Sequence, residues 1–188
     1  MYNHRRFTVP AVLALALIAQ AAGADEHRQH GSHVHGISHL NVVLDGTTLA
    51  IELDSPAANL VGFEHAPRSD AEHAQQAHAL ARLRKGETLF VLPAEARCRL
   101  EYVDVAEEYA DYLDEETEYH DEHEEDGHHH SDIKGEYLFH CDTPAALNGI
   151  DVQLFEAFPA TERLKVQFVA PKGQGGVDLV AGDHYLRF

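Results

Sequence analysis

The stretch LNVVLDGTTLAIEL, residues 40–53, decides the class of fold. Apolar and polar residues largely alternate on both sides of Asp45-Gly46, a dipeptide typical of a two-residue hairpin turn. The alternating apolar positions are Leu40, Val42 and Leu44 before the turn, and Leu49, Ile51 and Leu53 after it. Because successive side chains of a strand point to opposite faces, the pattern predicts an antiparallel hairpin packed on a core. The strand-like pattern begins upstream, at His33.

The residues after the hairpin predict one helix and several short strands. Ser69, with Glu72 three residues later, has the form of a capping box, and helical spacing continues to Gly86, which closes the helix. Strand-like runs cover residues 89–92, 97–105, 135–141, 147–155, 164–169, 177–180 and 185–188. The predicted fold is α+β, mainly antiparallel β and sandwich-like, with one helix of about four turns at 3.6 residues per turn.

The first 24 residues have the features of a secretory signal peptide. Arg5 and Arg6 precede an apolar run from Val9 to Ala22, and the small residues around Ala24 form a cleavage site. The alternative is an uncleaved anchor, but the apolar run is short for a membrane span. We therefore predict cleavage near Ala24, export of a single mature domain at residues 25–188, and no membrane insertion after cleavage.

The composition is acidic and rich in histidine. The 188 residues include 32 Asp and Glu against 14 Lys and Arg, for a net charge of -18. This charge argues against binding nucleic acid, because phosphate contacts need clustered Lys and Arg. The 16 histidines are several times the usual share, and imidazole is a common ligand of zinc and copper. The composition therefore favours a protein that binds metal cations.

The chain has two cysteines, Cys98 and Cys141. Export to an oxidising compartment allows them to form a disulfide. Cys98, Leu100 and Tyr102 share one face of a strand-like run, and Cys141 shares the apolar face of another, so both thiols are predicted to point to the apolar side. The alternative, two thiolates as metal ligands, would need polar surroundings.

The most ordered histidine cluster is predicted near the start of the mature domain. On a strand, His33, His35 and His39 would share one face, with the core on the other face. Zinc in proteins takes four ligands, so further ligands must come from elsewhere in the chain. His65 is the first choice and His184 the second. The alternative is a set of exposed surface histidines.

A second kind of metal site is predicted in a low-complexity insert at about residues 107–132. Between Glu107 and Asp126 there are twelve acidic residues and no Lys or Arg. The insert also carries five histidines: His120, His123, His128, His129 and His130. With no apolar stripe and strong self-repulsion, it is predicted to be mobile and to collect cations with low affinity and high capacity.

The ligand types favour Zn²⁺ over other metals. Copper(I) carriers use Met and Cys thiolates, whereas this chain has one Met, its first residue, and two cysteines predicted to be paired. Imidazole and carboxylate suit Zn²⁺, while Cu²⁺, Ni²⁺ or Co²⁺ would compete in vitro. A calcium site is not predicted, since no loop of the EF-hand type is present.

Several segments together resemble the ZrgA-like family of periplasmic zinc-uptake proteins. They are His33-Val34-His35-Gly36, Leu40-Asn41-Val42, Ser55-Pro56-Ala57, the run NLVGFEHAP at residues 59–67, the acidic His-rich insert, and the segments around Cys98 and Cys141. The resemblance covers nearly the whole mature chain. It implies an accessory of high-affinity zinc uptake that scavenges, buffers or delivers Zn²⁺. It further implies, as partner, a zinc importer or that importer's substrate-binding protein.

Two metalloenzymes are the alternatives to a zinc-binding protein. Exported copper-zinc superoxide dismutases carry an H-V-H motif, which His33-Val34-His35 matches, but their later ligand spacing reaches Arg82 here. A zinc hydrolase needs three ligands, an open position and a general base, and no H-E-x-x-H motif occurs. The sequence therefore predicts a protein that is not an enzyme.

Overall fold

The computed structural model describes residues 34–109 and 131–188. These residues belong to one compact unit of the chain, Ser32–Phe188, and a second unit covers Met1–Gly31. The predicted signal peptide lies outside the described residues, and so do residues 110–130 of the predicted insert. None of the helices in the described part is long and apolar enough to span a bilayer.

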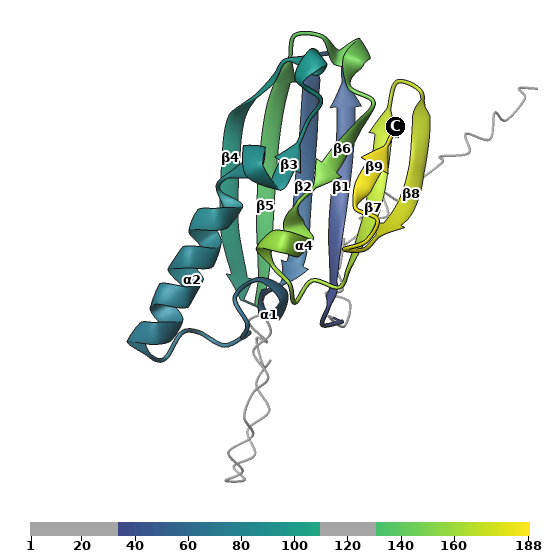
Figure 1. The fold of residues 1–188 in the computed structure, drawn as a ribbon. Helices are drawn as coiled ribbons and strands as arrows, with labels where there is room; N and C mark the ends of the chain where they lie inside the picture. Colours follow the sequence, from purple (N-terminus) through teal and green to yellow (C-terminus); the bar gives the residue numbers. More distant parts are fainter. Residues whose placement is uncertain (1–33, 110–130) are drawn as a thin grey trace, which may run out of the picture. The chain divides into compact units, whose positions relative to one another are not determined.

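A large mixed sheet forms one layer of the fold (Figure 1). Its six strands follow the order β4-β5-β2-β1-β7-β8, and every pairing is antiparallel except that of β1 with β7. The strands are β1 (Ile37–Asp45), β2 (Thr48–Pro56), β4 (Cys98–Tyr109), β5 (Ser131–Cys141), β7 (Arg163–Ala170) and β8 (Gly173–Leu179). The predicted mainly β, α+β architecture is thus present, with one parallel pairing that local pattern did not indicate.

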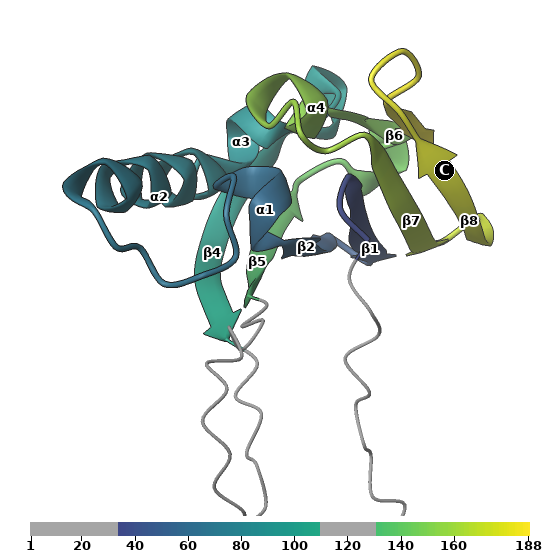
Figure 2. The same cartoon turned by 90° about the horizontal axis from the view of Figure 1, so that it is seen from below.

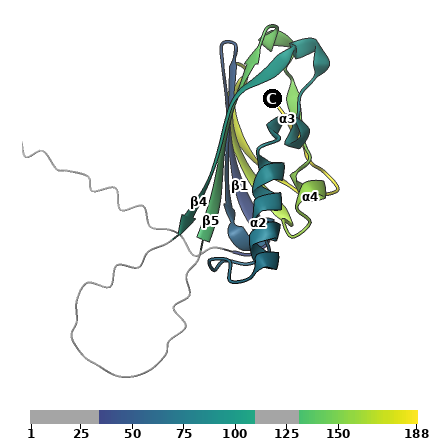
Figure 3. The ribbon, with the colours of Figure 1, turned by 90° about the vertical axis from the view of Figure 1, so that its left-hand side faces the viewer.

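The second layer covers only one face of the large sheet, as the edge-on view of Figure 3 shows. It contains a small sheet of order β3-β6-β9 together with the helices, and it replaces the second full sheet that a sandwich would have. Its elements are α1 (Ala57–Leu60), α2 (Asp70–Leu83), α3 (Gly86–Leu89), β3 (Phe90–Val91), η1 (Ala94–Ala96), η2 (Pro144–Ala146), β6 (Gly149–Val152), α4 (Leu154–Ala157) and β9 (Tyr185–Arg187).

The hairpin predicted from residues 40–53 is confirmed. The alternating apolar residues of β1 and β2 are all buried, and Gly46 takes the positive φ of 57° that the turn requires. The helix start is confirmed as well, because Ser69 and Glu72 form both hydrogen bonds of a capping box. The turn thus joins β1 to β2, the capping box starts α2, and the buried apolar residues place the inner face of the sheet on the core.

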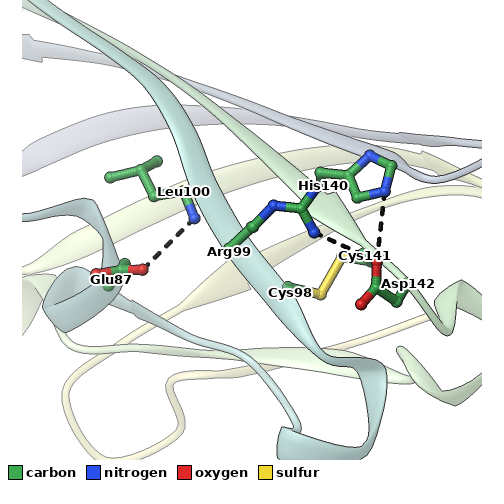
Figure 4. Close-up of a disulfide and its surroundings, with 7 residues drawn as sticks. All are labelled: Glu87, Cys98, Arg99, Leu100, His140, Cys141 and Asp142. Carbon is green, nitrogen blue, oxygen red and sulfur yellow. Dashed lines mark hydrogen bonds and ion pairs between the residues drawn. A yellow bond between two sulfur atoms is a disulfide. The ribbon is translucent and has the colours of Figure 1, made fainter.

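The predicted disulfide between Cys98 and Cys141 is confirmed, and Figure 4 shows its surroundings. The two residues are directly opposite each other in β4 and β5, and Cys141 is fully buried. Tyr102, however, does not share their face. A β-bulge shifts the register between Leu100 and Tyr102, so Tyr102 points outward opposite Leu138.

Two local predictions were wrong for tertiary reasons. Gly86 does not close α2, which ends at Leu83; it begins α3 and packs on Tyr137, where an added Cβ would lie 2.6 Å from the ring atom Cδ1. Residues 147–155 do not form one strand, because β6 stops at Val152 and α4 follows. Both segments lie in the layer that covers the sheet, where packing overrides local propensity.

The two strands that border the insert extend further than predicted. Glu107, Glu108 and Tyr109 pair with Ile133, Asp132 and Ser131, so the strand ladder continues into both ends of the predicted insert. Polar contacts support these ends. Lys134 forms an ion pair with Glu108 at 2.6 Å. The predicted insert of about residues 107–132 therefore narrows to residues 110–130, which lie outside the described part.

Candidate metal site

One end of the large sheet gathers several of the segments that carry predicted metal ligands. The register places the start of β1, the end of β2, the start of β5 and the end of β4 at the same end. Figure 2 looks along the strands from this end. The residues that border the undescribed segments, Val34, Tyr109 and Ser131, all belong to this end. We call it the open end of the sheet.

His35 lies in a tight turn at the open end and not on a strand. The prediction that the strand begins at His33 was wrong, since β1 starts at Ile37. The N–H of Ile37 bonds the carbonyl of Val34 at 3.0 Å, and Gly36 has a φ of 82°. This left-handed conformation suits glycine and breaks the alternation of faces. His35 and His39 are therefore not related by strand periodicity.

A buried asparagine fixes this turn. The Oδ1 of Asn59 accepts a hydrogen bond from the backbone N–H of Gly36 at 2.7 Å. The Nδ2 of Asn59 donates to the carbonyl of Ile37 at 3.0 Å and to Ser38 Oγ at 3.2 Å. Asn59 itself lies at the end of β2, in the short helix α1. Its three bonds hold the backbone next to His35 in one conformation.

His35 is paired with a carboxylate. Its Nε2 atom lies 2.8 Å from Oε1 of Glu64. The His35 side chain is 65% exposed while that of Glu64 is only 12% exposed, so the pair is open on the imidazole side. The backbone carbonyl of Glu64 accepts a hydrogen bond from Ser131 Oγ at 3.0 Å, which ties this segment to the start of β5. The Nε2 atom of His35 and the Oε1 atom of Glu64 thus face each other beside Ser131, the residue that follows the insert.

His65, the first choice for a further ligand, is adjacent to Glu64 in sequence but has different contacts. Its ring stacks on Phe63 with centroids 5.1 Å apart, and its Nδ1 lies 2.9 Å from the carbonyl of Ala66. Backbone N–H bonds from Arg68, and secondarily from Ser69, lower the pKa of Glu72, and the charge of His65 adds to this effect. His65 therefore lies near the first turn of α2. An N–H at Nδ1 bonded to a carbonyl would leave Nε2 as its free ligand atom.

His39 and His184 lie in two other places. His39 is on the exposed face of β1, opposite Asp54 of β2 and beside Lys165 of β7. His184 lies between β8 and β9, where its Nδ1 is 2.9 Å from the carbonyl of Ala181 and its Nε2 is 3.1 Å from Oδ1 of Asp151. Each therefore has a carboxylate neighbour, but no contact joins either of them to His35.

The remaining predicted ligands are not described by the structure. They are His33, His120, His123, His128, His129 and His130. Within residues 34–109 and 131–188, no group of three or more His, Cys, Asp or Glu side chains is arranged to hold a metal ion. The described part thus shows a contact between His35 and Glu64, and the assignment of the histidines as metal ligands stays a prediction.

Sequence reasoning missed Glu64 and Asn59. Both lie in the run NLVGFEHAP, residues 59–67, which was singled out for His65 alone. Glu64 gave no signal of its own, because one acidic residue in an acidic chain is unremarkable. For Asn59 a signal existed, since a polar residue between Ala57 and Leu60 in an apolar connection needs partners for its amide.

Residues 32–188 match the sequence model of the ZrgA family of zinc uptake proteins. No curated protein matches the chain. The matched range covers all described residues, including the open end of the sheet.

Proposed function

Because the chain belongs to the ZrgA family of zinc uptake proteins, we propose that it is a periplasmic zinc-binding protein. It would scavenge, buffer or deliver Zn²⁺ as an accessory to high-affinity uptake, after export and cleavage of the signal peptide near Ala24. The observation that carries the proposal is the pair formed by His35 Nε2 and Glu64 Oε1, 2.8 Å apart at the open end of the sheet.

The chemistry of this pair suits zinc. Imidazole nitrogen and carboxylate oxygen are both zinc ligands, with metal–ligand distances of about 2.0–2.2 Å. In a tetrahedral site two such ligand atoms lie about 3.3 Å apart. The present separation of 2.8 Å would therefore need to widen only slightly for a zinc ion to replace the shared proton. Glu64, which is only partly exposed, is the fixed ligand in this proposal and exposed His35 the accessible one.

The two classes of predicted ligands would have different roles. His35 and Glu64 start from a backbone that is already ordered by Asn59 and Ser131, so little conformational entropy is lost when the ion binds. The acidic insert, with five histidines between His120 and His130, would bind several ions more weakly and raise the local zinc concentration. Delivery to a zinc importer or its substrate-binding protein would follow release.

Calorimetric titration of Zn²⁺ tests the proposal. We compare the mature chain with a variant in which residues 110–130 are replaced by Asn-Gly, which keeps the paired strand ends intact. The tight site should survive this replacement while the weaker sites disappear. His35→Gln and Glu64→Gln should each weaken the tight site at least about tenfold, equal to about 1.4 kcal/mol.

His140→Gln is the matched control, since His140 lies at the opposite end of β5 from Ser131 and its side chain is 31% exposed. It should leave the tight site unchanged. Tight binding that disappears completely with residues 110–130, or that tolerates both His35→Gln and Glu64→Gln, would contradict the proposed site.

We further propose that the protein is not an enzyme. The H-V-H motif that suggests a dismutase has its second histidine in a turn, not on a strand, which gives that alternative no added support. A superoxide-quenching assay on copper-loaded protein tests this directly. Turnover near the diffusion limit would establish the enzymatic alternative.

A further inference from the structure

The outer face of the large sheet carries an ordered pattern of side chains that zinc binding does not use. The elements α2, α3 and α4 and the small sheet all cover the inner face, and no described element packs on the outer one (Figures 2 and 3). Outward side chains of neighbouring strands form rows across the sheet, because the strand register brings them directly opposite one another. One of these rows is apolar, and the row next to it is acidic.

The first, which we call the apolar row, crosses five strands without a break. Register pairs link all its members from β7 to β4: Val169, Val43, Ala50, Leu138 and Tyr102. The four large side chains are between 39% and 49% exposed. Tyr102 belongs to the row only because the bulge in β4 turns it outward. A continuous exposed apolar strip of this kind marks a contact surface more often than free surface.

The second, the acidic row, lies beside the apolar row, about 7 Å away along the strands. It consists of Glu52, Glu136 and Asp104, which are directly opposite one another in β2, β5 and β4. None of the three forms an ion pair with any residue of the described ranges. Like charges directly opposite each other destabilise a sheet. A cationic partner would remove this repulsion.

The apolar row ends at a groove near β8. The groove has a volume of about 730 Å³ and is lined by Val43, Val169, Gln174 and Gly176, among others. Gly176 is paired with Gln167 and has no side chain to fill the space above it. Glu52 of the acidic row and the amide side chains of Asn41 and Gln167 also line it, so a lysine or arginine of a partner could enter beside Val43 and Val169. The geometry thus provides a strip, a charged border and an anchoring groove on one face.

We infer that this outer face docks a protein partner whose contact surface carries apolar side chains next to lysines or arginines. The acidic row selects for the positive charge, and the apolar row supplies the contact area. The inference goes beyond the proposed zinc site and does not depend on it. Six strands about 4.8 Å apart and roughly nine residues long give a face of roughly 850 Å². That area is close to the 800 Å² or so that each partner contributes to a stable interface.

Two other occupants fit less well because of their charge. A second copy of the chain carries a net charge of -18 and would bring a second acidic row against the first. The chain's own insert, residues 110–130, has ten acidic residues and no Lys or Arg, so it would be repelled in the same way. The acidic row and the net negative charge of the chain therefore favour a basic partner.

Nuclear magnetic resonance of the ¹⁵N-labelled mature chain tests this inference. The probe is a ten-residue peptide that alternates valine and lysine, and the control peptides replace its lysines by glutamate or its valines by serine. The valine–lysine peptide should shift the amide signals of Val43, Ala50 and Leu138, and the shifts should weaken as salt is raised. The control peptides should give less than about a fifth of that effect.

Variants separate this surface from unspecific binding. Leu138→Ser interrupts the apolar row, and Glu136→Lys reverses the central charge of the acidic row while it relieves repulsion within the sheet. Each should weaken peptide binding at least fivefold. Val91→Ser, at a valine that is 44% exposed on β3, is the matched control and should change nothing.

Several outcomes would overturn the inference. One is an absence of shifts on the outer face, and another is equal binding of the valine–glutamate peptide. A concentration-dependent dimer that Leu138→Ser abolishes would assign the face to a second copy of the chain. Shifts of the same two rows when residues 110–130 are replaced by Asn-Gly would assign it to the chain's own insert.

Discussion

Removal of the disulfide should destabilise the protein by an amount that depends on the insert. The bridge joins Cys98 to Cys141 across a sequence separation of 43, and that loop contains residues 110–130. If the bridge acts by limiting the unfolded chain, a loop of this length contributes about 4 kcal/mol to the free energy of unfolding. The double variant Cys98→Ala/Cys141→Ala should therefore lose about that much, or roughly 8–16 °C in Tm for a domain of this size.

The same substitution in a shortened loop tests the reasoning. Replacing residues 110–130 by Asn-Gly reduces the loop from 43 residues to about 24, which lowers the contribution of the bridge by about 0.5 kcal/mol. Urea unfolding of four proteins, with and without the bridge in each background, gives both losses. The truncation of buried Cys141 is common to both backgrounds and cancels in their difference. A loss below about 1 kcal/mol in the full chain, or a loss that grows when the loop is shortened, would refute the entropic explanation.

Three other predictions concern side chains that position the sheet and the site. Burial raises the pKa of Tyr137. The folded state therefore keeps the phenol proton at pH values above about 10, where the unfolded state loses it. The free energy of unfolding should fall by up to about 1.4 kcal/mol per pH unit as the pH rises past that value. In alkaline urea titrations Tyr137→Phe should lack this component, and an unchanged slope would contradict it. Asn59→Ala removes three hydrogen bonds from the turn beside His35. We expect the free energy of unfolding in urea to fall by about 2–4 kcal/mol, and zinc binding measured by calorimetry to weaken. An unaltered zinc affinity would contradict the positioning role of Asn59. Gly86→Ala should lower the free energy of unfolding, measured by thermal unfolding, by about 1–3 kcal/mol because the added Cβ would overlap the Tyr137 ring. Gly182→Ala should be nearly neutral, since an added Cβ there would have nothing within 4 Å. Equal effects of the two substitutions would contradict this packing argument.

The parts of the fold that were predictable depend on local pattern. The alternation around Asp45-Gly46 specifies a hairpin because each strand needs one apolar face, and the capping box at Ser69 specifies a helix start through two local hydrogen bonds. The disulfide was predictable because two cysteines on apolar faces have one possible pairing, and the predicted export would allow it to form. None of these inferences needs knowledge of distant contacts.

The parts that were not predictable depend on tertiary contacts. The bulge that turns Tyr102 outward leaves no mark in the sequence, since it is set by the pairing of β4 with β5. The role of Gly86 is visible only once the Tyr137 ring lies against it. The parallel pairing of β1 with β7 joins segments more than 100 residues apart, which periodicity cannot detect.

The candidate site was likewise predictable where it depends on local sequence pattern and not where it depends on tertiary contacts. Histidine spacing singled out the region of His35 and the run from Asn59 to Pro67, and the structure brings the two into contact, while their role as metal ligands stays a prediction. It joins them through Glu64 and not through His65, because the Gly36 turn changes the direction of the chain before β1 begins. A strand-based reading of His33 and His35 could not include that turn, although Gly36 directly after His35 was a local indication of it.

The most direct test of the proposed zinc site is to locate the first zinc ion that the protein binds. Crystals of the mature chain soaked with one equivalent of Zn²⁺ would be measured on both sides of the zinc absorption edge. We expect an anomalous peak at the open end, about 2.0–2.2 Å from an imidazole nitrogen of His35 and a carboxylate oxygen of Glu64. An ordered zinc ion elsewhere, with the contact between His35 and Glu64 unchanged at 2.8 Å, would contradict it.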